Sequence, residues 1–156
     1  MSSKKLLGSI SIFILLSIFF IRIPVLAFEF SNDTYYTTEE EFDLSWIHSV
    51  EKEEWVEHYK VENDRIVLVS TKFKTFGAGV PSFSDQVELV DGYVHMMIDQ
   101  PYQELNLTIS ENVKSTIIFG EKLFKIYEYG ETYDTVRIKT KKLYIWQYFR
   151  EEFLWA

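Results

Sequence analysis

The sequence of 156 residues contains no cysteine, and only 16 of its residues are lysine or arginine. The absence of cysteine excludes every disulfide and also a lipid-modified cysteine anchor. Internal repeats and low-complexity segments are absent as well. Aromatic residues are abundant instead, at 17% of the chain, and this content favours β-structure and argues against disorder.

The first 27 residues have the pattern of an export signal. Lys4 and Lys5 precede an uncharged run from Leu6 to Ile21, and the segment ends in Val25-Leu26-Ala27. This order predicts a secretory signal cut after Ala27. An uncleaved membrane anchor over residues 6–28 is the alternative, although sixteen helical residues reach only about 24 Å of a hydrocarbon core about 30 Å thick. In both cases we expect the rest of the chain to be extracytoplasmic: secreted, periplasmic or at the cell surface.

The 129 residues after the leader are strongly acidic. They carry 13 basic and 24 acidic residues, a net charge of −11. Such a surface repels nucleic acid and anionic lipid headgroups, so neither is an expected partner. We expect residues 28–41 to form an acidic tether and residues 42–156 to form one domain with its own core.

Side chains alternate between apolar and polar over most of this domain. The pattern predicts eight or nine strands, within 42–50, 55–61, 66–76, 87–90, 93–98, 105–109, 115–119, 123–129 and 136–140. Asp91-Gly92 is a strong hairpin signal, and Asn63-Asp64 is typical of a two-residue turn with positive φ. The expected fold is all-β: one antiparallel β-sandwich or partly open barrel, preceded by an apolar leader helix.

The carboxyl end, residues 143–154, has two interpretations. Residues 143–149 fit a last strand, which an all-β chain favours. Leu143, Trp146, Phe149 and Phe153 also fall near helical spacing, and an exposed amphipathic end that touches a bilayer is the functional form of that alternative.

A polar ladder is expected inside the apolar face of the first three strands of this domain. If residues 51–54 form a four-residue hairpin loop, His48 pairs with Glu57 and Trp46 pairs with Tyr59. The turn at residues 63–64 then pairs Glu57 with Ser70 and Tyr59 with Leu68. His48, Glu57 and Ser70 are therefore expected side by side.

The expected ladder has a structural and a functional interpretation. A half-buried histidine beside a glutamate is either a satisfied core pair or a binding site. A catalytic triad is disfavoured because the acid, rather than the histidine, lies between the other two residues. One histidine and one glutamate also leave a Zn²⁺ ion two ligands short, so no metal or other cofactor is expected.

The segment Phe76-Gly77-Ala78-Gly79-Val80-Pro81 follows the third of these strands. Its glycines allow positive φ or a close backbone approach, and Pro81 stops further pairing. A nucleotide-binding loop is excluded because no third glycine, lysine or helix follows. The segment predicts a tight corner, or a loop whose exposed backbone meets a partner.

Three of these motifs together resemble the bacterial domain-of-unknown-function family 1850. They are the segment Trp-Ile-His-Ser-Val-Glu at residues 46–51, the pattern Trp55-x-Glu57-x-Tyr59, and residues 76–81. The resemblance covers about residues 42–81 and the downstream Asp91-Gly92. It implies a small exported protein, often encoded beside tripartite ATP-independent periplasmic (TRAP) transporters of the TAXI type. It implies no known reaction and no established catalytic residue.

Three functions are therefore open. The first is a non-enzymatic accessory protein that docks on a TAXI-type permease or its solute receptor. The second is a module that binds a small solute near His48, Glu57 and the Gly77 loop. The third, the least favoured, is a hydrolase that uses Ser70, His48 and Glu57.

Overall fold

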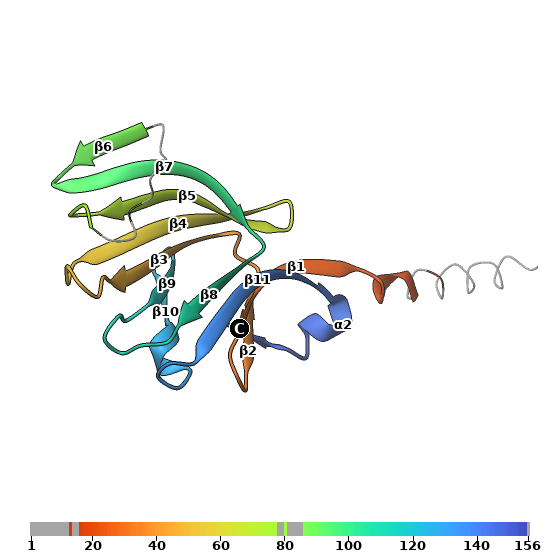
Figure 1. The fold of residues 1–156 in the computed structure, drawn as a ribbon. Coiled ribbons are helices and arrows are strands. Elements are labelled where there is room, and N and C mark those ends of the chain that lie inside the picture. The colour runs from red at the N-terminus through yellow and green to blue at the C-terminus, as the bar shows by residue number, and fades with distance from the viewer. Residues whose placement is uncertain (1–12, 14–15, 78–79, 81–85, 156) are drawn as a thin grey trace, which may run out of the picture.

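The computed structural model describes residue 13, residues 16–77, residue 80 and residues 86–155. This part of the chain is mostly β-structure, which confirms the expected class in its coarse form. The strands form two open sheets, one of five and one of seven strands, and neither sheet closes into a barrel (Figure 1).

The five-stranded sheet has the order β12-β2-β1-β11-β8, and the seven-stranded sheet has the order β10-β9-β3-β4-β5-β7-β6. In chain order, the strands are β1 (Arg22–Glu29), β2 (Thr34–Thr37), β3 (Glu41–Ile47), β4 (Glu54–Glu62), β5 (Arg65–Phe73), β6 (Gln86–Val90), β7 (Tyr93–Tyr102), β8 (Glu104–Thr108), β9 (Thr116–Phe119), β10 (Lys122–Lys125), β11 (Thr135–Tyr144) and β12 (Glu152–Phe153). A 3₁₀ turn, η1 (Ile126–Glu128), follows β10, and a single α-helical turn, α2 (Ile145–Tyr148), follows β11.

The main core lies between the two sheets. Phe28 of β1 and Ile138 of β11 belong to the same buried cluster as Phe42 of β3 and Ile66 of β5. A second cluster, Trp55, Phe73, Val94 and Met96, lies farther along the seven-stranded sheet, and Val80 packs against it. The half of the sheet that holds β5, β7 and β6 therefore has an apolar face of its own, beyond the shared core.

The strands β1 and β2 correct the expected domain layout. Residues 22–27 were expected in a leader helix and residues 28–41 in an acidic tether, but β1 pairs with both β11 and β2 and lies inside the five-stranded sheet. Residues 25–28 of β1 are all buried. A short apolar run is compatible both with the end of a leader and with a buried strand, and this ambiguity explains why residues 22–27 were assigned to the leader. The predicted cut after Ala27 falls inside β1.

The two short turns confirm their prediction from sequence. Asp91 and Gly92 both adopt positive φ, 51° and 79°, between β6 and β7. Asn63 and Asp64 do the same, at 51° and 61°, between β4 and β5. Such turns match the twist of the strands they join, so the local sequence specifies them.

The pairing of β3 with β4 differs from the expected register. Trp46 pairs with Trp55 rather than Tyr59, because the turn spans His48 to Glu53 and is longer than the expected loop. The shift is four residues, an even number, so each side chain keeps its expected face. Tyr59 pairs with Leu68 as expected, but a bulge at His58/Tyr59 changes the register beyond that point.

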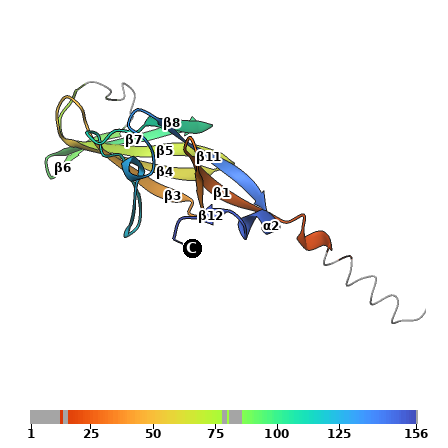
Figure 2. The ribbon, with the colours of Figure 1, turned by 90° about the horizontal axis from the view of Figure 1, so that it is seen from below.

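The carboxyl end is neither one strand nor one helix. β11 continues to Tyr144, α2 makes one turn, and β12 then pairs in parallel with β2. Gln147 holds the turn, because its side-chain oxygen accepts a hydrogen bond from the Tyr144 N–H at 2.9 Å. Figures 1 and 2 both place α2 beside the point where residues 16–21 leave the domain. Among the described residues, no helix is long and apolar enough to cross a membrane.

Candidate functional site

The turn between β3 and β4 places His48 beside Glu51. The His48 N–H donates to the carbonyl oxygen of Glu53 (2.8 Å), and the Lys52 N–H donates to the carbonyl oxygen of His48 (3.0 Å). Inside this turn His48 Nδ1 contacts Glu51 Oε2, and the two side chains are only 17% and 23% exposed. The partner of His48 is therefore Glu51 within its own turn, and the expected His48–Glu57 pair is wrong.

Gly77 lies against the same carboxylate. A methyl group at this position would overlap Glu51 Oε1 and lie 2.7 Å from Glu51 Cδ, a distance that real Cβ contacts do not reach. The close approach expected at Gly77 is thus present, and the group that approaches its backbone is the Glu51 side chain of the same protein. Ala78, Gly79 and Pro81, the other predicted residues of this loop, lie outside the described residues.

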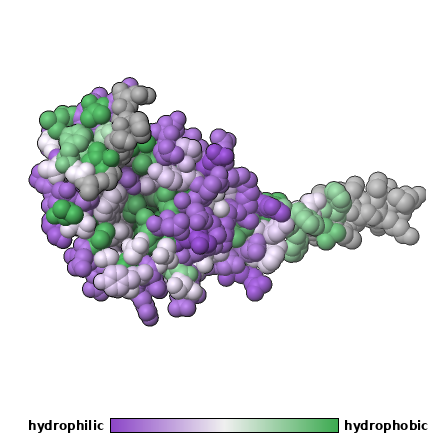
Figure 3. All heavy atoms as spheres, viewed as in Figure 1, coloured by the Kyte–Doolittle hydropathy of each residue, from purple (hydrophilic) through white to green (hydrophobic). Residues whose placement is uncertain are grey.

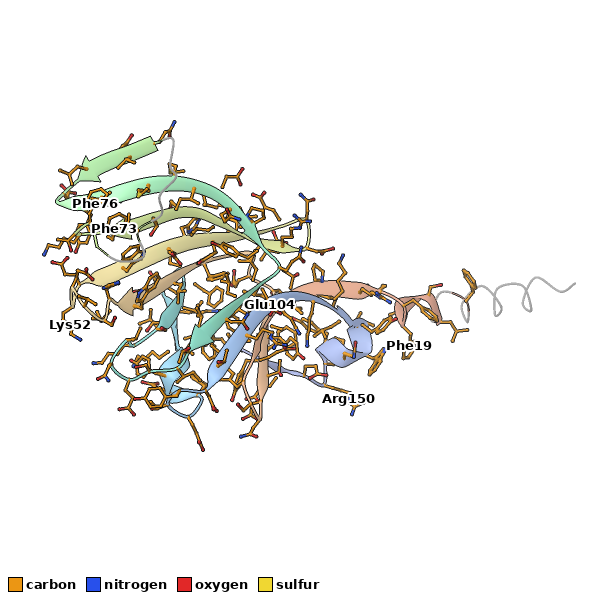
Figure 4. All side chains as sticks on the ribbon, viewed as in Figure 1. Phe19, Lys52, Phe73, Phe76, Glu104 and Arg150 are labelled. Carbon is orange, nitrogen blue, oxygen red and sulfur yellow. The ribbon has the colours of Figure 1, made fainter. Side chains whose placement is uncertain are left out.

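Stacked aromatic rings connect this turn to the seven-stranded sheet. Trp55 stacks on His48, on Trp46 and on Phe73, with ring centroids 5.7, 5.7 and 4.6 Å apart. Phe76 packs edge-on against Phe73 at 5.4 Å and is itself largely exposed. Figure 4 shows Phe73, Phe76 and Lys52 at the same end of the sheet. We call the group His48, Glu51, Trp55, Phe73, Phe76 and Gly77 the His48 corner.

Hydrogen bonds hold the His48 corner closed. Trp55 Nε1 donates to Thr71 Oγ1 at 2.7 Å, and Thr75 Oγ1 donates to Glu53 Oε2 at 2.7 Å. The crevice left between the described residues of the corner measures about 10 Å³. That volume admits one water molecule at most, so the geometry does not favour a bound solute here. Solute binding stays a prediction.

Glu57 lies on the core face of β4, away from His48. It pairs with Leu44 on one side and Thr71 on the other. Burial raises the pKa of the Glu57 carboxyl, and a hydrogen bond from Tyr59 Oη, 2.5 Å from Glu57 Oε2, partly opposes that rise. Burial and the nearby Glu57 charge in turn raise the pKa of Tyr59 and of Tyr102.

The bulge in β4 places Ser70 opposite His58 rather than Glu57. On its other side, His58 Nδ1 lies 2.7 Å from Asp43 Oδ1. The row Asp43, His58, Ser70 has the histidine in the middle, as nucleophilic catalysis requires. It lies, however, on the outer face of the sheet, and no hydrogen bond joins Ser70 to His58 within the described structure. The row therefore supports a surface ion pair rather than an activated serine.

The three residues of the hydrolase hypothesis do not come together. His48 lies in a turn, Glu57 on the core face and Ser70 on the outer face. Within the described ranges, no group of three or more acidic, histidine or cysteine side chains is placed to hold a metal ion.

The exposed edge strand β6 was not predicted as a functional surface. Its five residues are all exposed, and three of them are apolar: Val87, Leu89 and Val90. Figure 3 shows apolar residues gathered at this end of the molecule. Val87 and Leu89 lie opposite Met96 and Val94, on the face that holds the second cluster. One signal was available in the sequence, since Glu88 is the only charged residue of β6.

Comparison with known proteins places the chain in a family. No curated protein and no solved structure matches it. The family model described as "Domain of unknown function (DUF1850)" matches residues 42–126. The match spans β8 and the seven-stranded sheet, except for Glu41 at the start of β3, and it leaves β1, β2, β11 and β12 outside. More than half of the chain is covered, and the chain therefore belongs to the DUF1850 family.

Proposed function

We propose that this protein is a non-enzymatic, extracytoplasmic accessory protein that binds a component of a TAXI-type TRAP transporter through strand β6. The observation that carries the proposal is the exposed apolar edge of the seven-stranded sheet. The transporter is proposed because the family resemblance implies a small exported protein, often encoded beside such systems.

Among the described residues, the other sheet edges are better protected than β6. β8 has Glu104 and Asn106 on its edge, β12 has only two residues, and β10 has a lysine at each end. Charges and short length are the usual means by which natural proteins prevent association at an edge. No described strand pairs with the outer side of β6, so residues 87–90 of this edge can pair with a partner strand.

An extended segment of a partner protein fits this edge. Its main chain would pair with β6, and its alternate side chains would pack beside Val87 and Leu89. Burying a fully exposed leucine or valine contributes about 1.5–3 kcal/mol, and Val87 contributes less because it is only 52% exposed. Phe76, which packs on Phe73, extends the same apolar surface.

The His48 corner has a supporting role in this proposal. The contact of Glu51 with Gly77 and the packing of Phe76 on Phe73 hold the residues that follow β5 against the sheet. Those residues lead toward β6, so the corner helps to position the binding edge.

Site-directed photocrosslinking in native cells tests the proposal. A photoreactive amino acid is placed at Leu89, which is 75% exposed on β6, or at Leu123, which is 56% exposed on the opposite edge strand β10. We expect Leu89 to capture a TAXI-type permease or its solute receptor and Leu123 to capture neither. Equal capture from both positions, or none from Leu89, would contradict a specific β6 interface.

A charge at the edge provides a second test. Leu89→Lys should abolish copurification of the partner because a lysine on an edge strand disfavours strand addition. Leu123→Lys is the matched control and should copurify the partner like the native chain. Both side chains are exposed, so neither change should lower the stability of the fold by more than about 0.5 kcal/mol.

A further inference from the structure

Five exposed apolar residues gather where residues 16–21 enter the domain, beside α2. They come from two segments that are far apart in the sequence: Phe19, Phe20, Ile21, Trp146 and Phe149. We call them the basal patch. Figure 4 places Phe19 and Arg150 at this end of the molecule, and Figure 1 shows β6 at the other end.

Specific contacts hold the two halves of the basal patch together. The Ile145 N–H donates to the carbonyl oxygen of Ile21 at 3.0 Å, which ties α2 to the residue before β1. Arg22 Nη2 donates to Tyr144 Oη at 2.7 Å, and the Arg22 guanidinium lies 4.7 Å from the centre of the Tyr144 ring. Tyr144 in turn stacks on Trp146 at 6.0 Å. The position of Trp146 relative to Ile21 is therefore defined.

The basal patch continues the apolar run of the leader. In the sequence, residues 6–21 carry no charge, and Arg22 is the first charged residue after them. β1 begins at that arginine and is paired on both sides, so the end of the run is joined directly to the folded domain. An apolar run held in a bilayer would bring Ile21 and the adjoining α2 to the interface.

The composition of the basal patch suits the headgroup region. Tryptophan and tyrosine prefer the membrane–water interface, and an arginine beside them reaches the headgroups. The lysines beside Arg22 are paired with acids, since Lys141 contacts Glu29 and Lys142 contacts Asp64. Arg150 is followed directly in the sequence by Glu151 and Glu152. Contact with lipid is therefore expected to be apolar, without a requirement for anionic headgroups.

From these contacts we infer that the basal patch inserts into the interface of a phospholipid bilayer and orients the domain on it. The sheet edge at β6 is then directed away from the membrane surface. The inference does not require a transporter partner and goes beyond the proposed function.

Tryptophan quenching by brominated lipid tests this orientation. The full-length chain is reconstituted in phosphatidylcholine vesicles, with and without lipids brominated high on the acyl chains. Trp146→Phe is compared with Trp155→Phe, because the two tryptophans are equally exposed, at 42%. Trp155 packs instead on Phe119 and Lys122, away from the basal patch.

We expect Trp146→Phe to lose most of the quenching and Trp155→Phe to retain it. The quenching should stay the same when anionic lipid is added. Equal losses in the two variants would mean that the domain takes no fixed orientation on the bilayer, and quenching that requires anionic lipid would mean electrostatic adsorption. Either result would overturn the inference.

Discussion

Replacing Leu26 by alanine tests whether the segment before the predicted cut belongs to the folded domain. Leu26 is 1% exposed and lies in the main core between the two sheets. It also lies in β1, which pairs with β2 on one side and β11 on the other. Neighbouring strands on both sides limit how far the site can collapse after truncation.

The expected loss is large for one substitution. Removing a buried leucine side chain costs its transfer free energy and leaves a cavity, together about 3 kcal/mol and up to about 5 kcal/mol where the site does not relax. Leu89→Ala is the matched control, because it makes the same chemical change at a side chain that is 75% exposed. It should change the free energy of unfolding by less than about 0.5 kcal/mol.

The assay is urea denaturation of the full-length chain in mild detergent, with tryptophan fluorescence as the measure of unfolding. A Leu26→Ala effect no larger than that of Leu89→Ala would refute the place of β1 in the sheet.

The intact mass of the protein from its native host adds a second measurement. We expect residues 22–27 to be present, and a chain that begins at Phe28 would show that the first six residues of β1 are removed.

Three further changes test the remaining features. Gly77→Ala should destabilise the fold by up to about 1 kcal/mol, because the Glu51 carboxylate ends a flexible side chain and must shift away from the new methyl group. Glu51→Ala in the same chain should remove most of that loss, and additive losses in a double-mutant cycle would refute the contact. His48→Ala should cost about 1–3 kcal/mol because the half-buried Glu51 carboxylate loses its ion-pair contact with His48 Nδ1, whereas a thermal midpoint equal to that of the native chain would show that the pair contributes nothing. Glu57→Gln should remove a pH dependence: burial raises the folded pKa of Glu57 above 4.5, so its contribution to stability is complete below about pH 4.5 and is lost as the pH rises through the folded pKa. Denaturation midpoints of the native chain and the Glu57→Gln variant should therefore diverge toward neutral pH, and parallel profiles would contradict the buried carboxyl.

The candidate site was predictable only in part. The sequence singled out His48, Gly77 and Phe76, and the structure brings all three into one corner. It also suggested Glu57 and Ser70, which lie elsewhere because a longer turn and a bulge changed the pairing. Glu51, the actual partner of His48, is three residues along the chain, and only the conformation of the turn makes it a neighbour.

The sequence alone determined which side chains share a face and where the tightest turns lie. Alternation repeats every two residues, so Leu44 and Trp46 of β3 and Glu57 of β4 keep one face even after the register of these two strands moves by four. Asp91-Gly92 acts locally, because its positive φ angles need no distant contact. Tertiary structure decided the rest. Pairing between distant segments produces the burial of residues 25–28, the bulge at His58 and the contact of Ile21 with α2. A local apolar pattern cannot predict these features, because it is the same whether or not a partner strand lies beside it.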